Sequence, residues 1–411
     1  MHLWSCWVTK VMMVVNVMSK NNVKPEIRFK NFTDAWEQRK LGELGSIGMN
    51  KRIFKEQTSE VGEIPFYKIG TFGGKADAFI SRELFEDYKS KYPYPNIGDI
   101  LISASGSIGR TVEYKGNDEY FQDSNIVWLR HKGRIDNSFL KQFYTIVKWL
   151  GLEGSTIKRL YNKNILNTTI NLPSLVEQKK IGEFFNRIDD TIALHQHELT
   201  LLKQRKKAFL QKMFPKKGER NPELRLLNLD EEWRLQSIGH CFEERNERSS
   251  KGELLSVTIN SGVVKASSLD RKDSSSNNKS NYKVVNEGDI AYNSMRMWQG
   301  ASGLSLYNGI VSPAYTILVP KEKIDSHFFS YYFKLYYMIK TFQSNSQGLT
   351  SDTWNLKYPL IKKIPLSIPS YDEQIEISKF FKKIDEDIEL HVQKLEKLKQ
   401  MKKAFLQKMF V

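Results

Sequence analysis

Cysteine is scarce in this chain of 411 residues, which has only Cys6 and Cys241. Two cysteines cannot build a disulfide framework, so we expect the protein to work in a reducing compartment, the cytoplasm. Long apolar runs are also missing. The run Val11–Val15 is far shorter than the roughly 18–20 residues that span a bilayer, so no membrane partner is expected. No cluster of cysteine and histidine has the spacing of metal ligands, so no metal is predicted.

The first 17 residues look unlike the rest of the chain. Lys10 precedes a short apolar run, as in a signal peptide, but no small-residue cleavage site follows it. We therefore favour Met18 as the natural start. Residues 1–17 would then be a non-native or disordered extension.

Positive charge is abundant. The net charge is +16, the sequence pI is about 9.4, and 12% of the residues are aromatic. Such a surplus favours a polyanionic partner, most often nucleic acid. The alternative is a generally basic cytosolic protein without such a partner.

One segment of the chain occurs twice. Residues 173–214 return as residues 369–410, shifted by 196 positions, and 25 of the 42 pairs are identical. Both copies begin with P-S-x-x-E-Q and end with KKAFLQKMF. Each copy follows a segment of much less similar sequence. We call these segments variable domain 1 (residues 18–172) and variable domain 2 (residues 215–368).

The repeated segments have the spacing of coiled-coil helices. Apolar or special residues follow one another in alternating steps of four and three, the period of a coiled-coil seam. In the first copy they are Ile181, Phe185, Ile188, Ile192, His195, Leu199, Leu202, Lys206, Phe209 and Met213, and the second copy repeats them. Each helix must bury this stripe, and the other copy is the obvious partner. Because a variable domain separates the copies, an antiparallel pair is expected.

Two positions of each seam are polar: His195 with Lys206, and His391 with Lys402. Histidines here could bind a ligand or act as a switch near neutral pH. We favour the simpler interpretation that polar seam residues fix the register of the pair.

The variable domains share a series of short sequence landmarks, which indicates one common skeleton. Landmarks keep their order while their offset drifts from 197 to 189 positions, as loop insertions in one common fold would produce. They are Pro25–Phe29 with Pro222–Leu226, Trp36 with Trp233, Gly98–Ile100 with Gly288–Ile290, and Phe139 with Phe328.

Short β-branched and aromatic runs between these landmarks predict strands of a mixed sheet. They are Asp99–Ser103, Asn125–Leu129 and Ala314–Val319. Helical patterns lie at Ser138–Leu150 and His327–Phe342. We therefore predict an α+β fold with two similar mixed α/β domains, joined by long antiparallel coiled-coil helices at residues 173–214 and 369–411. The whole should have internal pseudo-twofold symmetry.

This arrangement resembles the specificity subunit of type I restriction–modification enzymes, over nearly the whole chain from Met18. The motifs that carry the resemblance are P-x-x-x-E-Q, K-x-x-x-L-x-x-x-M-F, and the glycine-rich segments Gly98–Gly109 and Gly288–Gly300. The resemblance implies two target-recognition domains. Each would read one half of a split site in double-stranded DNA, and the helices would set the gap between the halves.

The resemblance also implies partners and cofactors. Two modification subunits would dock on the helices and methylate adenine with S-adenosylmethionine, and restriction subunits would use ATP and Mg²⁺. This chain would bind no cofactor and catalyse nothing. The docking residues that we predict are Phe184, Phe185, Phe209, Met213, Phe380, Phe381, Phe405 and Met409.

Catalytic motifs are missing where these reactions would need them. An adenine methyltransferase needs an N/D-P-P-aromatic loop for the flipped base, but Asn221–Leu224 lacks the second proline and the aromatic residue. A phosphate loop is also absent, because Gly74-Lys75 is followed by Ala76. Two alternatives have less support. One is a fused enzyme, for which the chain has no catalytic region to spare. The other is a stand-alone DNA-binding regulator with internal twofold symmetry.

Polar and basic loop residues are our candidates for DNA contact, because such side chains read base edges and hold phosphates. In variable domain 1 they are Ser103, Ser105, Ser107, Arg110, Lys158, Arg159 and Lys163. In variable domain 2 they are Asn293, Ser294, Arg296, Trp298, Gln299, Asn345 and Gln347. For each one, the alternative is an ordinary solvated loop residue. The recognised bases themselves cannot be deduced from the sequence.

Overall fold

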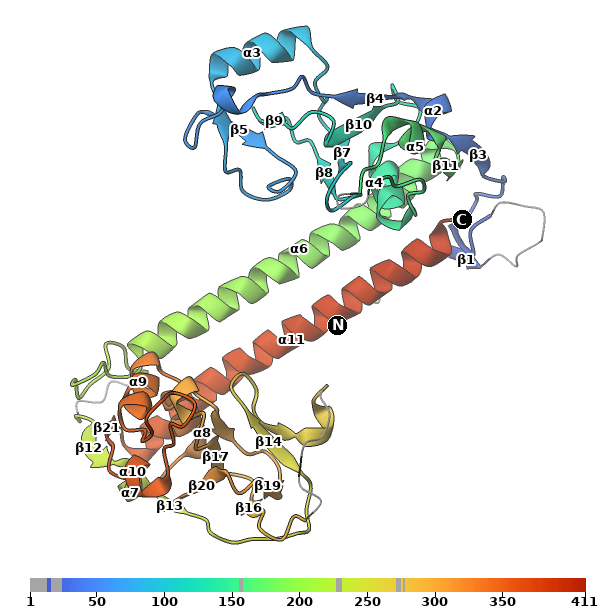
Figure 1. The fold of residues 1–411 in the computed structure, drawn as a ribbon. Helices are drawn as coiled ribbons and strands as arrows, with labels where there is room; N and C mark the ends of the chain where they lie inside the picture. The colour runs from blue at the N-terminus through green and yellow to red at the C-terminus, as the bar shows by residue number, and fades with distance from the viewer. Residues whose placement is uncertain (1–12, 16–23, 155–157, 227–230, 271–274, 276–277) are drawn as a thin grey trace. The chain divides into compact units, whose positions relative to one another are not determined.

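The structure, a computed structural model, describes residues 13–15, 24–154, 158–226, 231–270, 275 and 278–411 (Figure 1). The chain forms two compact units. Unit 1 comprises residues 1–196 and 393–411, and unit 2 comprises residues 197–392. Each unit therefore contains one variable domain and a segment of both repeated helices. No helix in the described part of the chain is long and apolar enough to cross a membrane.

Variable domain 1 is built from short strands and helices. Its elements are β2 (Ile27–Phe29), β3 (Glu37–Lys40), α2 (Leu41–Leu44), β4 (Ser46–Met49), η1 (Lys55–Gln57), β5 (Ile64–Tyr67), β6 (Phe79–Ile80), α3 (Arg82–Lys91), β7 (Ile100–Ser103), β8 (Thr111–Glu113), β9 (Tyr120–Phe121), β10 (Ile126–Arg130), α4 (Asn137–Ile146), α5 (Asn162–Asn167) and β11 (Thr169–Leu172). Ahead of them, β1 (Met13–Val15) pairs antiparallel with β2. Part of the expected 1–17 extension is thus a strand, and residues 1–12 and 16–17 lie outside the described residues.

Variable domain 2 has the same kind of elements in a similar order. They are β12 (Arg234–Ser237), α7 (Ile238–Cys241), β13 (Phe242–Glu244), β14 (Leu255–Thr258), β15 (Gly262–Lys265), η2 (Ala266–Ser268), β16 (Lys283–Val285), β17 (Ile290–Asn293), η3 (Met297–Gln299), β18 (Ser302–Leu304), β19 (Gly309–Val311), β20 (Tyr315–Pro320), α8 (Ser326–Tyr332), α9 (Tyr336–Ser344), α10 (Tyr358–Ile361) and β21 (Pro365–Ile368). The predicted strands appear as β7, β10 and β20. The predicted helix at His327–Phe342 is two helices, α8 and α9.

The central sheets confirm that the domains share one skeleton. The strand order is β4-β10-β7-β8 in variable domain 1 and β13-β20-β17-β18 in variable domain 2. Every pairing in these two sheets is antiparallel. The prediction of a mixed sheet was therefore wrong for them, because strand periodicity does not report direction. A parallel pair, β5 with β9, occurs in a smaller sheet of variable domain 1.

The repeated segments are the long helices α6 (Leu175–Lys212) and α11 (Tyr371–Met409). Contacts within each unit show that the two helices run antiparallel. In unit 1 the ring of Phe184 lies 5.1 Å from that of Phe405, and in unit 2 the ring of Phe209 lies 5.0 Å from that of Phe380. The 196-residue shift relates the two pairs: Phe380 is the counterpart of Phe184, and Phe209 is the counterpart of Phe405. The predicted pseudo-twofold symmetry thus extends to individual contacts.

The motif P-S-x-x-E-Q ties each long helix to its variable domain. In unit 1 the Glu177 carboxylate accepts hydrogen bonds of 2.7 and 2.8 Å from Arg28, and both side chains are almost completely buried. The Gln178 amide accepts from the backbone N–H of Asp136, which itself caps α4. Unit 2 repeats this arrangement with Arg225, Glu373, Gln374 and Asp325.

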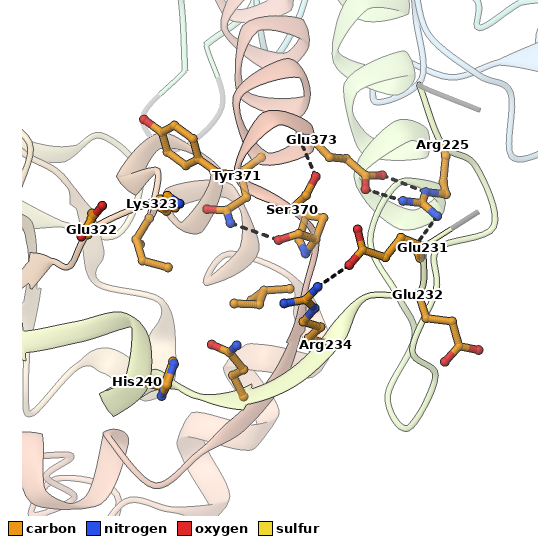
Figure 2. A pocket seen from close by; sticks show the side chains of 15 residues that line it. Arg225, Glu231, Glu232, Arg234, His240, Glu322, Lys323, Ser370, Tyr371 and Glu373 are labelled. Carbon is orange, nitrogen blue, oxygen red and sulfur yellow. Dashed lines mark hydrogen bonds and ion pairs between the residues drawn. The ribbon is translucent and has the colours of Figure 1, made fainter. Parts of the chain in front are cut away.

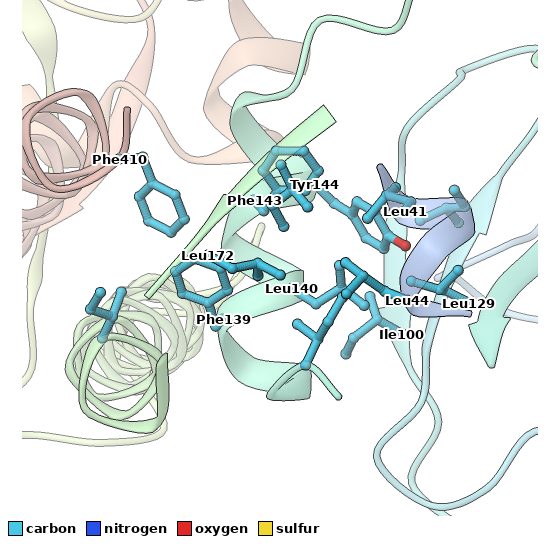
Figure 3. Packing of buried hydrophobic residues seen from close by; sticks show 14 of the residues in the cluster. Leu41, Leu44, Ile100, Leu129, Phe139, Leu140, Phe143, Tyr144, Leu172 and Phe410 are labelled. Atoms are coloured by element: carbon cyan, nitrogen blue, oxygen red, sulfur yellow. The ribbon is translucent and has the colours of Figure 1, made fainter. Parts of the chain in front are cut away.

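The opposite end of each long helix completes a core. Phe410, at the end of α11, stacks on Phe139 at 5.0 Å and meets Trp36 edge-on at 6.2 Å. Figure 3 shows the Phe410 ring beside the buried side chains of variable domain 1. Phe214, just past the end of α6, makes the matching contacts with Phe328 and Trp233 in unit 2.

The polar seam positions make ion pairs inside each unit. Lys402 donates to Asp189 at 2.6 Å, and Lys206 donates to Asp385 at 2.5 Å. His391 lies with its Nδ1 3.3 Å from the Glu198 carboxylate. A shift of the helices would break these pairs, so the contacts are compatible with the predicted role of the polar positions in fixing the register.

Candidate nucleic-acid interface

The glycine-rich segment after each G-D-I sequence is a hairpin loop of the central sheet. In variable domain 1 it joins β7 to β8, and in variable domain 2 it joins β17 to β18. The two loops close alike: the N–H of Ser103 donates to Arg110 O, and the N–H of Asn293 donates to Ala301 O. We call these loops hairpin loop 1 (residues 104–110) and hairpin loop 2 (residues 294–301).

A second segment lies against each hairpin loop. The N–H of Leu160 donates to Ala104 O, and the N–H of Leu356 donates to Ser294 O, both at 2.8 Å. Further out, backbone bridges pair Glu153 with Arg159 and Gln347 with Asn355. We call these segments facing loop 1 (residues 153–154 and 158–163) and facing loop 2 (residues 345–355). The sequence predicted the candidates of each domain as two separate groups, and the structure brings each pair of groups together.

The serines of hairpin loop 1 hold the loop itself. Ser103 is buried, and its hydroxyl donates to Ser107 O and accepts from the N–H of Arg110. Ser105 is also buried and donates to the Asn125 side chain at 2.7 Å. Ser107 and Arg110 are exposed, although the Arg110 guanidinium donates to Phe72 O at 2.8 Å. Of these four candidates, Ser107 and Arg110 are therefore the ones open to solvent.

Facing loop 1 supplies cations. Lys158 and Arg159 are exposed, and Arg159 bridges both Ser105 and Glu153 through its backbone. Lys163 is exposed too, 2.9 Å from the Glu153 carboxylate. A cavity of about 440 Å³ lies between this segment and Ala104 of hairpin loop 1. Variable domain 1 thus presents a basic surface around a hollow.

Hairpin loop 2 also divides into buried and exposed candidates. Ser294 is buried against Thr316, with 2.8 Å between their hydroxyls, and the Asn293 amide oxygen accepts from the N–H of Met295. Arg296 is exposed. Among the described residues, its guanidinium has no hydrogen-bond or ion-pair partner. It is therefore available for an anionic or base-edge contact.

The remaining candidates lie on hairpin loop 2, which carries Trp298 and Gln299, and on facing loop 2, which carries Asn345 and Gln347. Trp298 is half-buried and lies edge-on to Trp354, with ring centroids 5.2 Å apart. Gln299 is half-buried, whereas Asn345 and Gln347 are exposed. The Asn345 amide donates to Thr341 O at 2.9 Å, which orients it at the end of α9.

Sequence reasoning missed a lysine that supports hairpin loop 2. Lys334 follows α8, and its ammonium donates to Gly300 O at 2.5 Å and to Ile259 O at 2.8 Å. Burial lowers the pKa of Lys334 to about 8, since a buried site disfavours the charged form. Nothing in the local sequence distinguishes Lys334 from other lysines. Trp354, Met295 and Leu349 were also missed, although an apolar residue in a polar loop could have been a signal.

The predicted docking residues make contacts within the units. Phe185, Phe381, Met213 and Met409 are at most 1% exposed, because they pack into the cores of the variable domains. The others, Phe184, Phe209, Phe380 and Phe405, make the interhelical ring contacts. All eight side chains therefore make contacts within this chain, although Phe209, Phe380 and Phe405 remain partly exposed. Helical spacing shows which face of a helix is apolar but not what covers that face.

A polar cavity of about 400 Å³ lies in unit 2 at the start of α11. Figure 2 shows it lined by side chains of both charges, with the ion pair of Arg225 and Glu373 on its wall. None of the DNA-contact candidates lines this cavity. It belongs to the anchor between α11 and variable domain 2.

Comparison with known proteins agrees with this architecture. A family model described as the type I restriction modification DNA specificity domain matches the chain twice, over residues 33–204 and 230–400. The chain belongs to this family. As a specificity subunit with two target-recognition domains, it is a non-catalytic component that acts with DNA and other restriction–modification subunits. This membership replaces the alternatives of a fused enzyme and a stand-alone regulator.

Individual relatives of the specificity subunit carry the same description. A type I restriction enzyme specificity subunit of Haemophilus influenzae is 54% identical over 150 residues, which is 36% of this chain and 39% of that protein. The MjaX specificity subunit of Methanocaldococcus jannaschii is 26% identical over 90% of this chain and 92% of its own length. The crystal structure of the S subunit from M. genitalium has a TM-score of 0.60 at 15% identity, covering 94% of this chain and 99% of that one, and so supports the fold.

Proposed function

We propose that each variable domain reads one half of an asymmetric bipartite site in double-stranded DNA. One observation carries this proposal: both domains present a hairpin loop and a facing loop on the same skeleton, but with different side chains. Arg110 and Arg159 lie at the positions where variable domain 2 has Ala301 and Asn355. Different side chains on equivalent loops would read different bases.

The exposed cations would supply most of the affinity. Lys158, Arg159 and Arg296 can neutralise backbone phosphates, and the net charge of +16 attracts the duplex over a longer range. The buried candidates Ser103, Ser105 and Ser294 would shape the loops, while the exposed ones would contact DNA. Binding should therefore weaken steeply as salt concentration rises.

The partners in this proposal are two modification subunits, which methylate adenine using S-adenosylmethionine, and restriction subunits, which use ATP and Mg²⁺, in the cytoplasm. Because the helix phenylalanines are internal, docking would use outward residues of α6 and α11. Leu194 and Leu390 occupy equivalent positions of the repeat and are 55% and 46% exposed. Two equivalent apolar positions suit two copies of one partner.

The test of the function is to express the specificity subunit with its modification subunits and map methylated adenines in the host genome. We expect one non-palindromic motif with two unlike halves and unspecified bases between them. A palindromic motif from the full-length chain, or methylation without a motif, would contradict the proposal.

Replacing Arg296 with alanine should relax or abolish recognition of one half-site. The guanidinium is exposed and unpartnered among the described residues, and a base contact of this kind contributes about 1–3 kcal/mol. The measurement is the methylated motif of the variant. Gln407→Ala, an exposed change on α11, is the control and should leave both halves intact. If the complex with Arg296→Ala methylates the same motif at the same rate, this arginine takes no part in recognition.

The helices would act as a ruler for the gap between half-sites. Seven residues inserted after His197 and after Gln393 preserve the alternating seam, so the pair should still form. The insertion adds about 10 Å at roughly 1.5 Å per residue, or about three base pairs at about 3.4 Å each. Methylation of a random-sequence library would report the new gap.

Insertion of two residues at the same points is the matched control. It rotates the seam away from its partner and should prevent assembly. An unchanged gap in an active seven-residue variant would show that the helices do not set the spacing.

A further inference from the structure

Two large apolar side chains stand exposed on the loops of variable domain 2. Met295 of hairpin loop 2 is 43% exposed, and Leu349 of facing loop 2 is fully exposed, at 102%. Residues 354–356 link the two loops. The ring of Trp354 packs on that of Trp298, and the N–H of Leu356 donates to Ser294 O. The two side chains therefore stand on two loops that contact each other, and Arg296 lies on the first of these loops.

Hydrogen bonds keep Leu349 away from the core. The bridge between Gln347 and Asn355 closes the loop, and Thr353 donates from its N–H and its hydroxyl to Thr350 O. Gly348, with φ +146°, lets the chain pass close to Thr353: an added Cβ would lie 2.6 Å from Thr353 O. These bonds hold the backbone on both sides of Leu349, whose side chain is exposed at the end of the loop.

The neighbours of these side chains suit the major groove of DNA. Arg296 offers a cation, and the exposed amides of Asn345 and Gln347 offer donors and acceptors. The apolar feature that base edges present in this groove is the 5-methyl group of thymine. Met295 corresponds to the buried Ser105 of variable domain 1, so this apolar position distinguishes the two domains.

We propose that variable domain 2 recognises thymine through its 5-methyl group, using the side chains of Met295 and Leu349. This inference rests on the proposed function, because it assigns a base type to the surface that reads one half-site. Burial of one methyl group on binding corresponds to a change in affinity of about fourfold.

The experiment uses the full complex of this chain with its modification subunits. Its binding is measured to DNA duplexes that carry the motif this complex methylates. The half-site of variable domain 2 is identified first, as the half that Arg296→Ala relaxes. Deoxyuridine then replaces thymidine, one position at a time, which removes only the 5-methyl group. We expect at least one position in this half where affinity falls about fourfold.

The variant Met295→Ala/Leu349→Ala should bind the thymidine duplex more weakly and should lose the difference between thymidine and deoxyuridine. The control is Leu235→Ala, which removes a leucine that is 63% exposed on β12 of the same domain and should keep the difference. Equal affinity for both duplexes in the unmodified complex would overturn the proposal. The proposal would also be overturned if the double variant showed the same deoxyuridine effect as the unmodified complex. It would be overturned too if the double variant lost affinity while deoxyuridine had no effect, because the side chains would then act as a wedge between bases. Failure of the proposed function is distinguishable, because the complex would then not prefer the unsubstituted motif over random DNA.

Discussion

Replacing Phe410 with alanine is expected to destabilise variable domain 1, although the two lie at opposite ends of the sequence. The ring is 9% exposed and contacts Phe139, Trp36 and Phe185. Removing a buried phenylalanine ring costs about 3–5 kcal/mol, through lost burial and the cavity that remains. Hydrogen exchange can measure this domain by domain, and protection should fall in α4 and β10 of variable domain 1.

The matched control is Phe214→Ala, which makes the equivalent change in unit 2. There the loss of protection should appear in α8 and β20, because Phe214 packs on Phe328 and Tyr332. If both variants weakened the same domain, or if Phe410→Ala left variable domain 1 unchanged, the assignment of the helix ends to the two cores would be wrong.

Replacing Glu177 with alanine should cost unit 1 about 3–5 kcal/mol, because the change leaves the Arg28 guanidinium buried without its carboxylate. Only 3% of the arginine side chain and 1% of the glutamate side chain are exposed. Urea unfolding, followed by hydrogen exchange in α6 and β2, would measure the loss.

Two further variants separate the buried charge from simple loss of a side chain. Arg28→Met/Glu177→Leu removes both charges and should recover much of the stability, because apolar replacement of a whole buried pair is often neutral. Glu37→Ala breaks an exposed pair with Arg39 and should reduce stability far less than Glu177→Ala, because solvent screens an exposed ion pair. A double variant as unstable as Glu177→Ala would contradict this explanation.

The repeated features of the fold could be predicted from the sequence because they are local or duplicated. The four–three spacing identified the seam from Ile181 to Met213, and the order of the landmarks identified two copies of one skeleton. Both signals survive in a single sequence. Strand direction does not leave such a signal, which is why the antiparallel order around β7 and β17 was not predicted.

The candidate interface was predicted only in part, because its geometry is non-local. Ser105 and Arg159 are neighbours in space but 54 positions apart in the chain, and no periodicity reports that contact. Ser103 and Ser294 have suitable side chains, yet the fold uses their hydroxyls internally. Leu349 was overlooked for the opposite reason, since a leucine is expected to be buried.

Unit 1 is assembled from the two ends of the chain, and this has a consequence during synthesis on the ribosome. Unit 2 is complete at residue 392, whereas variable domain 1 lacks Phe410 until that residue has been translated. At about 5–20 residues per second, the roughly 240 residues after variable domain 1 take about 10–50 s to make. The domain synthesised first is thus the last to complete its core, and Trp36 lacks its contact with Phe410 during that time.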